Sequence, residues 1–233
     1  MADRQRFRTV SVMKVVLEFE GAVADESDAC YAAHAAAAEA SGWAKLDQAS
    51  FWRLMRSQGP DAVFLRGAKP LKLKEYHEAF QRLIAEPSIH RKLVFPDHIQ
   101  ESLRRVCHVS DCTIVTLHDD TDSIRSMLTS QLSGTSLPLV VLSSIPGMRV
   151  GQLRDLAGDA RQRVFVATSD ALIRAGNSAD YLTVGLSSGR CGRKRLEQAG
   201  ASVILRDLED FAECLAAGGK ELLDAGLMPF STN

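Results

Sequence analysis

The stretch that decides the fold is Val15–Asp25, which reads V-V-L-E-F-E-G-A-V-A-D. Its first three residues are apolar without alternation, which is typical of a central strand in a parallel sheet covered on both faces. Ligands bind to such sheets just beyond the carboxyl ends of the strands. Glu18 and Glu20 fall there, and the two-residue period of a strand directs both side chains to the same side. An acid pair at this position suits a cation, or a phosphoryl group with its metal; a solvated strand end is the other interpretation.

The rest of the chain alternates between strand and helix, which predicts a parallel α/β sheet. Further strands are predicted at 112–117, 137–142, 163–167, 181–186 and 203–205, with helices at 97–107, 122–132, 150–157, 170–178, 193–199 and 208–217. Between the first two strands only helical patterns occur, at 25–41, 48–58, 60–66 and 71–85. We therefore expect a Rossmann-like core (1–24 and 97–233) with an all-helical cap (25–96) inserted after strand one.

Composition excludes several classes of protein. At 233 residues, with 45% hydrophobic and 24% charged residues, the chain suits one globular core with an insert. A net charge of −1 and a pI near 6.6 predict neither nucleic acid nor a membrane as a partner. No apolar run approaches the roughly 18 residues of a membrane span, and no secretion signal is apparent, so we expect a cytoplasmic protein. Its five cysteines form no metal or disulfide pattern and should be reduced thiols.

The segment E-F-E-G-A-V-A-D at 18–25 resembles the first motif of the haloacid dehalogenase (HAD) superfamily of phosphohydrolases, D-x-D-G-T-L-x-D after a hydrophobic strand. The spacing, Gly21 and Asp25 match, whereas both motif aspartates are glutamates in this chain. The resemblance covers nearly the whole sequence. The helical insert matches the cap of phosphoglycolate-phosphatase-like members, and Gly200–Ile204 is similar to the C-terminal G-A-D-x-V-I pattern of the family.

The resemblance implies roles for the two glutamates. Glu18 would be the nucleophile that attacks phosphorus, and Glu20 would protonate the leaving group and activate water. Mg²⁺ would be held by Glu18, the backbone carbonyl of Glu20 and an acid from the fourth motif. Each extra methylene moves a carboxylate by about 1.5 Å, Mg²⁺ requires nearly octahedral oxygens, and a misplacement of roughly 1 Å can lower a rate about 10²-fold. We therefore expect phosphohydrolase activity to be absent or strongly reduced.

The second motif of the family is a strand-end serine or threonine that donates to the phosphoryl oxygens. Thr116 stands at that place, and the resemblance implies this role, although threonine is common at strand ends in any sheet. The following residues, His118 to Asp120, are interpreted as a loop that starts a helix, with Asp120 or Thr121 as its cap. A catalytic base at His118 is the alternative.

The third motif supplies a cation that neutralises the phosphoryl charge. Arg149 is our candidate, in a predicted loop after the third strand, and Arg154, inside the next helix, is the alternative. The helical insert offers further cations, of which we expect one to reach the cleft, with Arg66 as the first choice: Arg53, Arg56, Arg66 and Lys69. A solvated helix face is the other interpretation of these charges.

The fourth motif, G-D-S-x-x-D, supplies the metal-binding acids. Counting back from Val184-Gly185-Leu186 aligns Thr168 and Leu172 with those acids, and neither side chain can replace a carboxylate. Asp170 is either a substitute metal ligand or a helix cap, and we favour the cap. Mg²⁺ is the cofactor that the resemblance implies, and we expect its binding to be weak or lost.

Two functions remain open. One is a HAD-like protein that is retained for ligand binding or regulation, with a small phosphorylated molecule as its ligand. The other is a Mg²⁺-dependent phosphatase of a small phosphometabolite that uses Glu18 as nucleophile. Hydrolytic dehalogenation is a distant third, because that chemistry requires an aspartate at position 18. The sequence specifies no protein partner.

Overall fold

The computed structural model of the protein describes residues 13–59, 70–132 and 137–226. A sheet of six parallel strands forms its centre, in the order β3-β2-β1-β4-β5-β6. The strands are β1 (Met13–Glu18), β2 (Asp111–Thr116), β3 (Leu139–Val141), β4 (Gln162–Ala167), β5 (Leu182–Leu186) and β6 (Val203–Leu205). The prediction of a Rossmann-like parallel sheet is confirmed.

Strand β1 lies between β2 and β4, and all six of its residues are buried. Its side chains alternate between two cores. Val15 and Leu17 pack on one face of the sheet and Val16 packs on the other. This is why the apolar residues of β1 do not alternate with polar ones in the sequence.

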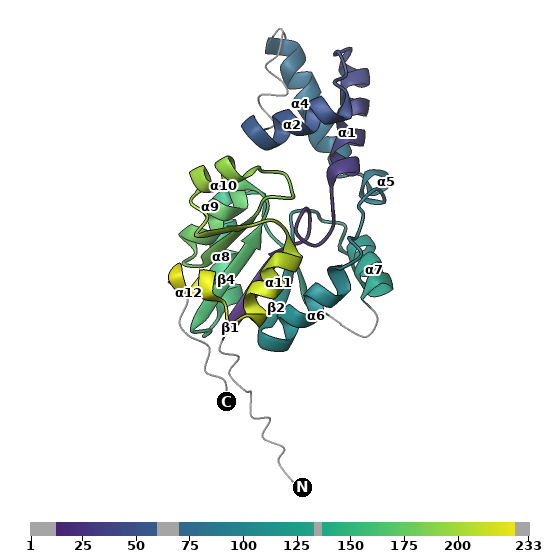
Figure 1. The fold of residues 1–233 in the computed structure, drawn as a ribbon. Coiled ribbons are helices and arrows are strands. Elements are labelled where there is room, and N and C mark those ends of the chain that lie inside the picture. The colour runs from purple at the N-terminus through teal and green to yellow at the C-terminus, as the bar shows by residue number, and fades with distance from the viewer. Residues whose placement is uncertain (1–12, 60–69, 133–136, 227–233) are drawn as a thin grey trace.

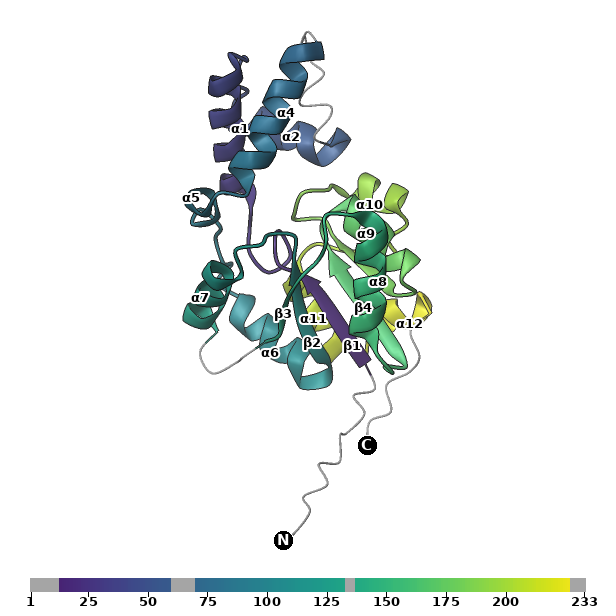
Figure 2. The same ribbon diagram turned by 180° about the vertical axis from the view of Figure 1, so that it is seen from behind.

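Helices cover both faces of the sheet (Figures 1 and 2). One face carries α6 (Ile99–Val109), α7 (Thr121–Gln131), α11 (Leu208–Ala216) and the short α12 (Lys220–Asp224). The other face carries α8 (Pro146–Ala157), α9 (Asp170–Ser178) and α10 (Arg193–Ala199). Among the described residues, no helix is long and apolar enough to cross a membrane, and all five cysteine thiols are free, as predicted.

The helices between β1 and α6 form a separate layer above the sheet (Figure 1). They are α1 (Ser27–Ser41), α2 (Gln48–Gln58), α4 (Pro70–Ile84) and α5 (Pro87–His90). This helical insert has its own core, which includes Ala33, Phe51 and Tyr76. Two backbone hydrogen bonds between Asp25 and Val94, of 2.7 and 3.0 Å, join the chain where it enters and leaves the insert. The limits 25–96 remain a prediction, and the helix predicted at 60–66 lies outside the described residues.

The predicted start of one helix is wrong, and the difference affects a candidate site residue. Helix α8 begins at Pro146 rather than at 150, so Arg149 lies in its first turn and not in a loop. Gly147 and Gly151 lower the helix propensity of this segment, whereas a proline in the first turn is compatible with a helix because its missing N–H would be unbonded there. Burial of Leu153 and Ala157 against the sheet supports the helix.

Candidate functional site

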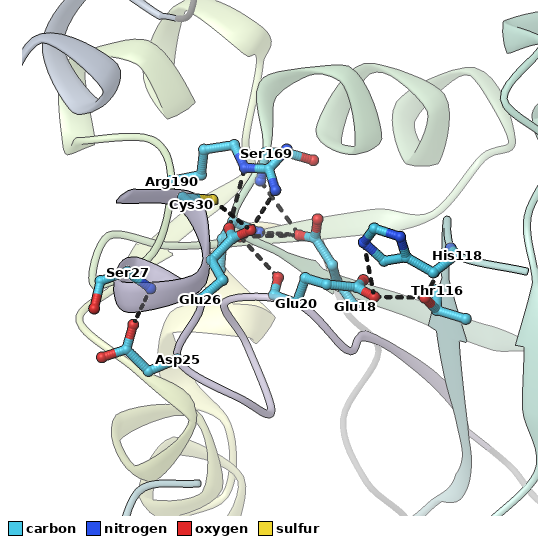
Figure 3. A network of polar contacts seen from close by, with 11 residues as sticks. Glu18, Glu20, Asp25, Glu26, Ser27, Cys30, Thr116, His118, Ser169 and Arg190 are labelled. Carbon is cyan, nitrogen blue, oxygen red and sulfur yellow. Dashed lines mark hydrogen bonds and ion pairs between the residues drawn. The ribbon is translucent and has the colours of Figure 1, made fainter. Parts of the chain in front are cut away.

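The carboxyl ends of β1, β2 and β4 meet at one edge of the sheet, below the helical insert. Glu18 is the last residue of β1, Thr116 is the last residue of β2, and Thr168 directly follows β4. Figure 3 shows Glu18, Glu20 and Thr116 side by side. The structure therefore brings these three predicted site residues together, while their catalytic roles remain predictions.

The Glu18 carboxylate is held by the end of β4. Its Oε2 atom accepts hydrogen bonds from the backbone N–H of Thr168 at 2.5 Å and of Ser169 at 3.3 Å. The Thr168 hydroxyl donates to the same oxygen at 3.1 Å. Because Glu18 is only 3% exposed, these three donors replace the water that a carboxylate would otherwise bind.

The Glu20 carboxylate turns toward β2 instead. Its Oε1 atom accepts a hydrogen bond of 2.5 Å from the Thr116 hydroxyl. The same oxygen lies 3.7 Å from Nε2 of His118 (Figure 3). The hydroxyl that the HAD resemblance assigns to a phosphoryl group therefore donates to Glu20 in this structure.

Thr168 joins the two acidic residues. Its hydroxyl oxygen lies 3.1 Å from Glu18 Oε2 and 3.3 Å from the backbone carbonyl oxygen of Glu20. Two glycines make room for this side chain: a Cβ atom at Gly21 would lie 2.5 Å from Thr168 Oγ1, and one at Gly189 would lie 2.5 Å from Thr168 Cβ. Gly21 also has a φ of +86°, a conformation that glycine adopts at little cost.

Burial changes the protonation of both glutamates. It raises the pKa of Glu18 to about 7, although the Thr168 N–H lowers it in part. Burial likewise raises the pKa of Glu20 to about 8, against the effect of the Thr116 hydrogen bond, and the charge of Glu18 raises it further. At neutral pH Glu20 is therefore mostly protonated, and Glu18 is a mixture of acid and carboxylate.

A partly buried ion pair that the sequence analysis missed lies beside Glu18. Glu26, which is 2% exposed, accepts two hydrogen bonds from the Arg190 guanidinium, one of them 3.1 Å long from Nε to Oε1 (Figure 3). The Cys30 thiol donates to Glu26 Oε2 at 3.4 Å. The charge of Arg190 also lowers the pKa of Glu18, while that of Glu26 raises it. A guanidinium thus supplies the positive charge next to the acid pair.

Two histidines connect this site to the helical insert. The ring centroids of His118 and His90 are 4.1 Å apart, and His90 belongs to α5. Burial lowers the pKa of His118 to about 4, so it is neutral at neutral pH. Asp120 accepts a hydrogen bond of 3.2 Å from the N–H of Ser123 and caps α7, which confirms the predicted cap.

The two candidate cations of the third motif have other partners. Arg149 is buried and donates to the carbonyl oxygens of Ser143 at 3.0 Å and of Ser144 at 3.1 Å. It is close enough for the charge of Glu18 to raise its pKa, although burial lowers the pKa by more. Arg154 donates to the carbonyl of Ser178 on the outside of the core at 2.6 Å.

Asp170 is the first residue of α9, and Ser169 occupies the cap position without a capping side-chain bond. Asp170 Oδ2 forms an ion pair of 2.8 Å with Arg195 of α10, and Oδ1 accepts from the N–H of Ala171 at 3.0 Å. The favoured interpretation of Asp170 as the cap of this helix is therefore wrong, because the cap position is Ser169, one residue earlier. Each of its two carboxylate oxygens has a partner other than Glu18 or Glu20.

Of the cations in the helical insert, Arg56 reaches the core, where it donates to the carbonyl of Ser187. Arg53 is exposed. The first choice, Arg66, and Lys69 lie outside the described residues.

The residues at these strand ends do not fit a magnesium ion. Mg²⁺ needs hard oxygen ligands in a nearly octahedral arrangement, and the position that would supply an acid from β4 carries the Thr168 hydroxyl. That hydroxyl already bonds to the two groups that would coordinate the ion, the Glu18 carboxylate and the Glu20 carbonyl. In the part of the chain that the structure describes, the only cluster of three potential ligands within 4.8 Å of one another is His98, Asp207 and Glu209, between α6 and α11.

The architecture defines a class: the chain has the fold of haloacid dehalogenase-like hydrolases. The structure is similar to that of a haloacid dehalogenase-like hydrolase from Streptococcus pneumoniae, with a TM-score of 0.65 and 13% sequence identity. The match covers 89% of this chain and 98% of the hydrolase. A predicted phosphatase from Clostridium acetobutylicum is similar over 88% of this chain and 99% of its own chain, with a TM-score of 0.67 and 9% sequence identity. A predicted phosphoglycolate phosphatase from Haemophilus somnus is similar over 86% of this chain and 96% of its own chain, with a TM-score of 0.60 and 16% sequence identity.

No protein-family model matches the chain, and comparison with curated proteins gives no match. At such low identity the structural similarity establishes the fold, and the function has to be argued from the site.

Proposed function

We propose that this protein is a HAD-like protein whose phosphohydrolase activity is absent or strongly reduced, and that it is retained for binding a small phosphorylated molecule or for regulation. One observation carries the first part: the Thr168 hydroxyl bridges Glu18 and the Glu20 carbonyl, where the HAD resemblance calls for a carboxylate and a metal. A neutral hydroxyl lacks the negative charge of a carboxylate, and this one is already bonded to the two groups that would coordinate the ion.

The pairing of Glu20 with Thr116 supports the first part of this proposal, the absent or strongly reduced phosphohydrolase activity. A phosphoryl group in this crevice would need a free hydroxyl from β2, whereas the Thr116 hydroxyl donates to Glu20. Binding of phosphate by Thr116 would require this 2.5 Å hydrogen bond to break. The buried Glu20 side chain would then lose the hydroxyl donor that satisfies it.

The protonation of Glu18 also opposes nucleophilic attack. A carboxyl group attacks phosphorus as the carboxylate, and burial raises the pKa of Glu18 to about 7. The carboxylate form is in turn stabilised by the two N–H groups and the hydroxyl at the end of β4. These hydrogen bonds reduce its nucleophilicity, because they must weaken as it attacks.

The alternative function is a Mg²⁺-dependent phosphatase with Glu18 as nucleophile, Glu20 as acid and base, and Asp170 as a metal ligand. Its weakest element is Asp170, whose carboxylate forms an ion pair of 2.8 Å with Arg195. A metal at this site would have to compete with a guanidinium for its third ligand.

Phosphoester turnover distinguishes the two functions. We expect the wild-type protein with Mg²⁺ to hydrolyse a panel of small phosphoesters no faster than a Glu18→Gln variant. Circular dichroism of both proteins verifies that they are folded. Turnover well above background that disappears in Glu18→Gln would overturn the proposal and establish the phosphatase.

A further inference from the structure

A hollow lies where α2 of the helical insert faces the loop before α10 of the core. Its volume is about 540 Å³, which is within the usual range of small-molecule sites. Its lining comes from residues 49–57 and 192–194: Ala49, Trp52, Arg53, Arg56, Ser57, Gly192, Arg193 and Lys194. None of the acids or hydroxyls of the crevice described above belongs to this lining, so the hollow is a separate site.

The charge of this hollow is strongly positive. Arg53, Arg193 and Lys194 are exposed, and no described carboxylate lies within the 4 Å of an ion pair with any of them. A chain with a net charge of −1 has enough acids to neutralise these cations, yet no acid among the described residues forms an ion pair with them. Clustered cations without counter-charges attract an anion, and arginine suits phosphate oxygens because its donors form a planar fork.

The two walls of the hollow are fixed to each other by hydrogen bonds. The N–H of Gly192 donates to the Arg56 carbonyl at 2.9 Å. Arg195 donates to the Met55 carbonyl at 2.6 Å while its other nitrogen pairs with Asp170. The end of α2 is therefore held against α10, and the backbone segments that carry the cations keep their spacing without a ligand.

A second hollow adjoins this one at Trp52. Trp52 and Ala49 line both, and the second hollow, of about 400 Å³, is completed by Asp25, Ser27, Gln48 and Ser188. It offers polar groups instead of cations. Asp25 Oδ1 accepts from the N–H of Ser27, and its other carboxylate oxygen can accept from a ligand. The two adjoining hollows thus offer a group of cations in the first, the Trp52 indole shared by both, and the Asp25 carboxylate in the second.

We propose that these two adjoining hollows form a binding site for a mononucleotide. The phosphates would contact Arg53, Arg193 and Lys194, the base would stack on Trp52, and Asp25 would accept from a hydroxyl or amino group. Stacking of a base on an aromatic side chain contributes affinity for any base, so the site specifies nucleotides as a class.

Fluorescence provides the test, because the chain has two tryptophans. In a Trp43→Phe variant, Trp52 is the only fluorescent indole, and ADP, adenosine and inorganic phosphate are titrated separately. We expect saturable quenching by ADP, with binding of adenosine and of inorganic phosphate at least about tenfold weaker, since each makes only part of the contacts. Added salt should weaken the binding of ADP.

Matched variants locate the binding. In the Trp43→Phe background, Arg53→Glu with Lys194→Glu should weaken ADP binding at least about tenfold. Lys92→Glu, which reverses an exposed cation elsewhere on the insert, should leave it unchanged. Absence of saturable quenching, equal loss in the Lys92→Glu control, or phosphate binding as tight as ADP binding would each overturn the proposal. These outcomes are independent of whether the crevice hydrolyses phosphoesters.

Discussion

Replacement of Arg190 by methionine is expected to lower the free energy of unfolding by roughly 3 kcal/mol. The variant leaves the Glu26 carboxylate buried without its cation, and the Cys30 thiol is then its remaining side-chain donor. We place the loss of stability at the lower end of the range expected for breaking a buried ion pair, because the Arg190 side chain is 30% exposed. Urea unfolding at neutral pH measures the effect.

Two controls separate this electrostatic effect from loss of packing. The double variant Glu26→Gln with Arg190→Met removes both charges and should recover most of the lost stability. Arg104→Met, which breaks an exposed pair with Glu101, should leave the free energy of unfolding nearly unchanged, because solvent screens exposed ion pairs. If the double variant is no more stable than Arg190→Met, the ion pair is not the source of the effect.

The contribution of Glu20 to the stability of the protein should decrease as the pH rises from about 5 to about 9. The ordinary pKa of a glutamate is 4.5, and burial raises that of Glu20 to about 8. Between these values the folded state holds a proton that the unfolded state has released, so each increase in pH favours the unfolded state. The free-energy difference is on the order of 5 kcal/mol, because the two pKa values differ by about 3.5 and one pKa unit corresponds to about 1.4 kcal/mol.

Glu20→Gln tests the origin of this pH dependence. The amide cannot ionise, so the variant should approach wild-type stability near pH 5 and exceed it near pH 9. Glu39→Gln, at an exposed position of α1, should follow the wild-type curve. Chemical unfolding at several pH values gives both curves, and parallel curves for wild type and Glu20→Gln would contradict the assigned protonation.

The fold could be predicted because its signals are local. The uninterrupted apolar run of β1 reflects burial on both faces of the sheet, and its position identifies the central strand. The convergence of Glu18 and Thr116 follows from the same reasoning, because parallel neighbours end at the same edge. The start of α8 could not be predicted, since two glycines oppose a helix that packing against the sheet supports.

The chemistry of the site could be predicted only in part. The missing acid at Thr168 is visible in the sequence, whereas the hydrogen bonds that hold Glu18 and Glu20 are not. The pair of Glu26 and Arg190 joins residues 164 positions apart, and no spacing rule connects them. The sequence shows only that Glu26 directly follows the first motif and that Arg190 directly follows Gly189, and neither position predicts an ion pair.

Calorimetric titration of the protein with Mg²⁺ tests the central claim most directly, namely that Thr168 and its hydrogen bonds replace the metal in this crevice. We expect no saturable heat for the wild-type protein, and no difference between it and Glu18→Gln. A one-to-one binding curve that is present in the wild type and absent in Glu18→Gln would contradict the account.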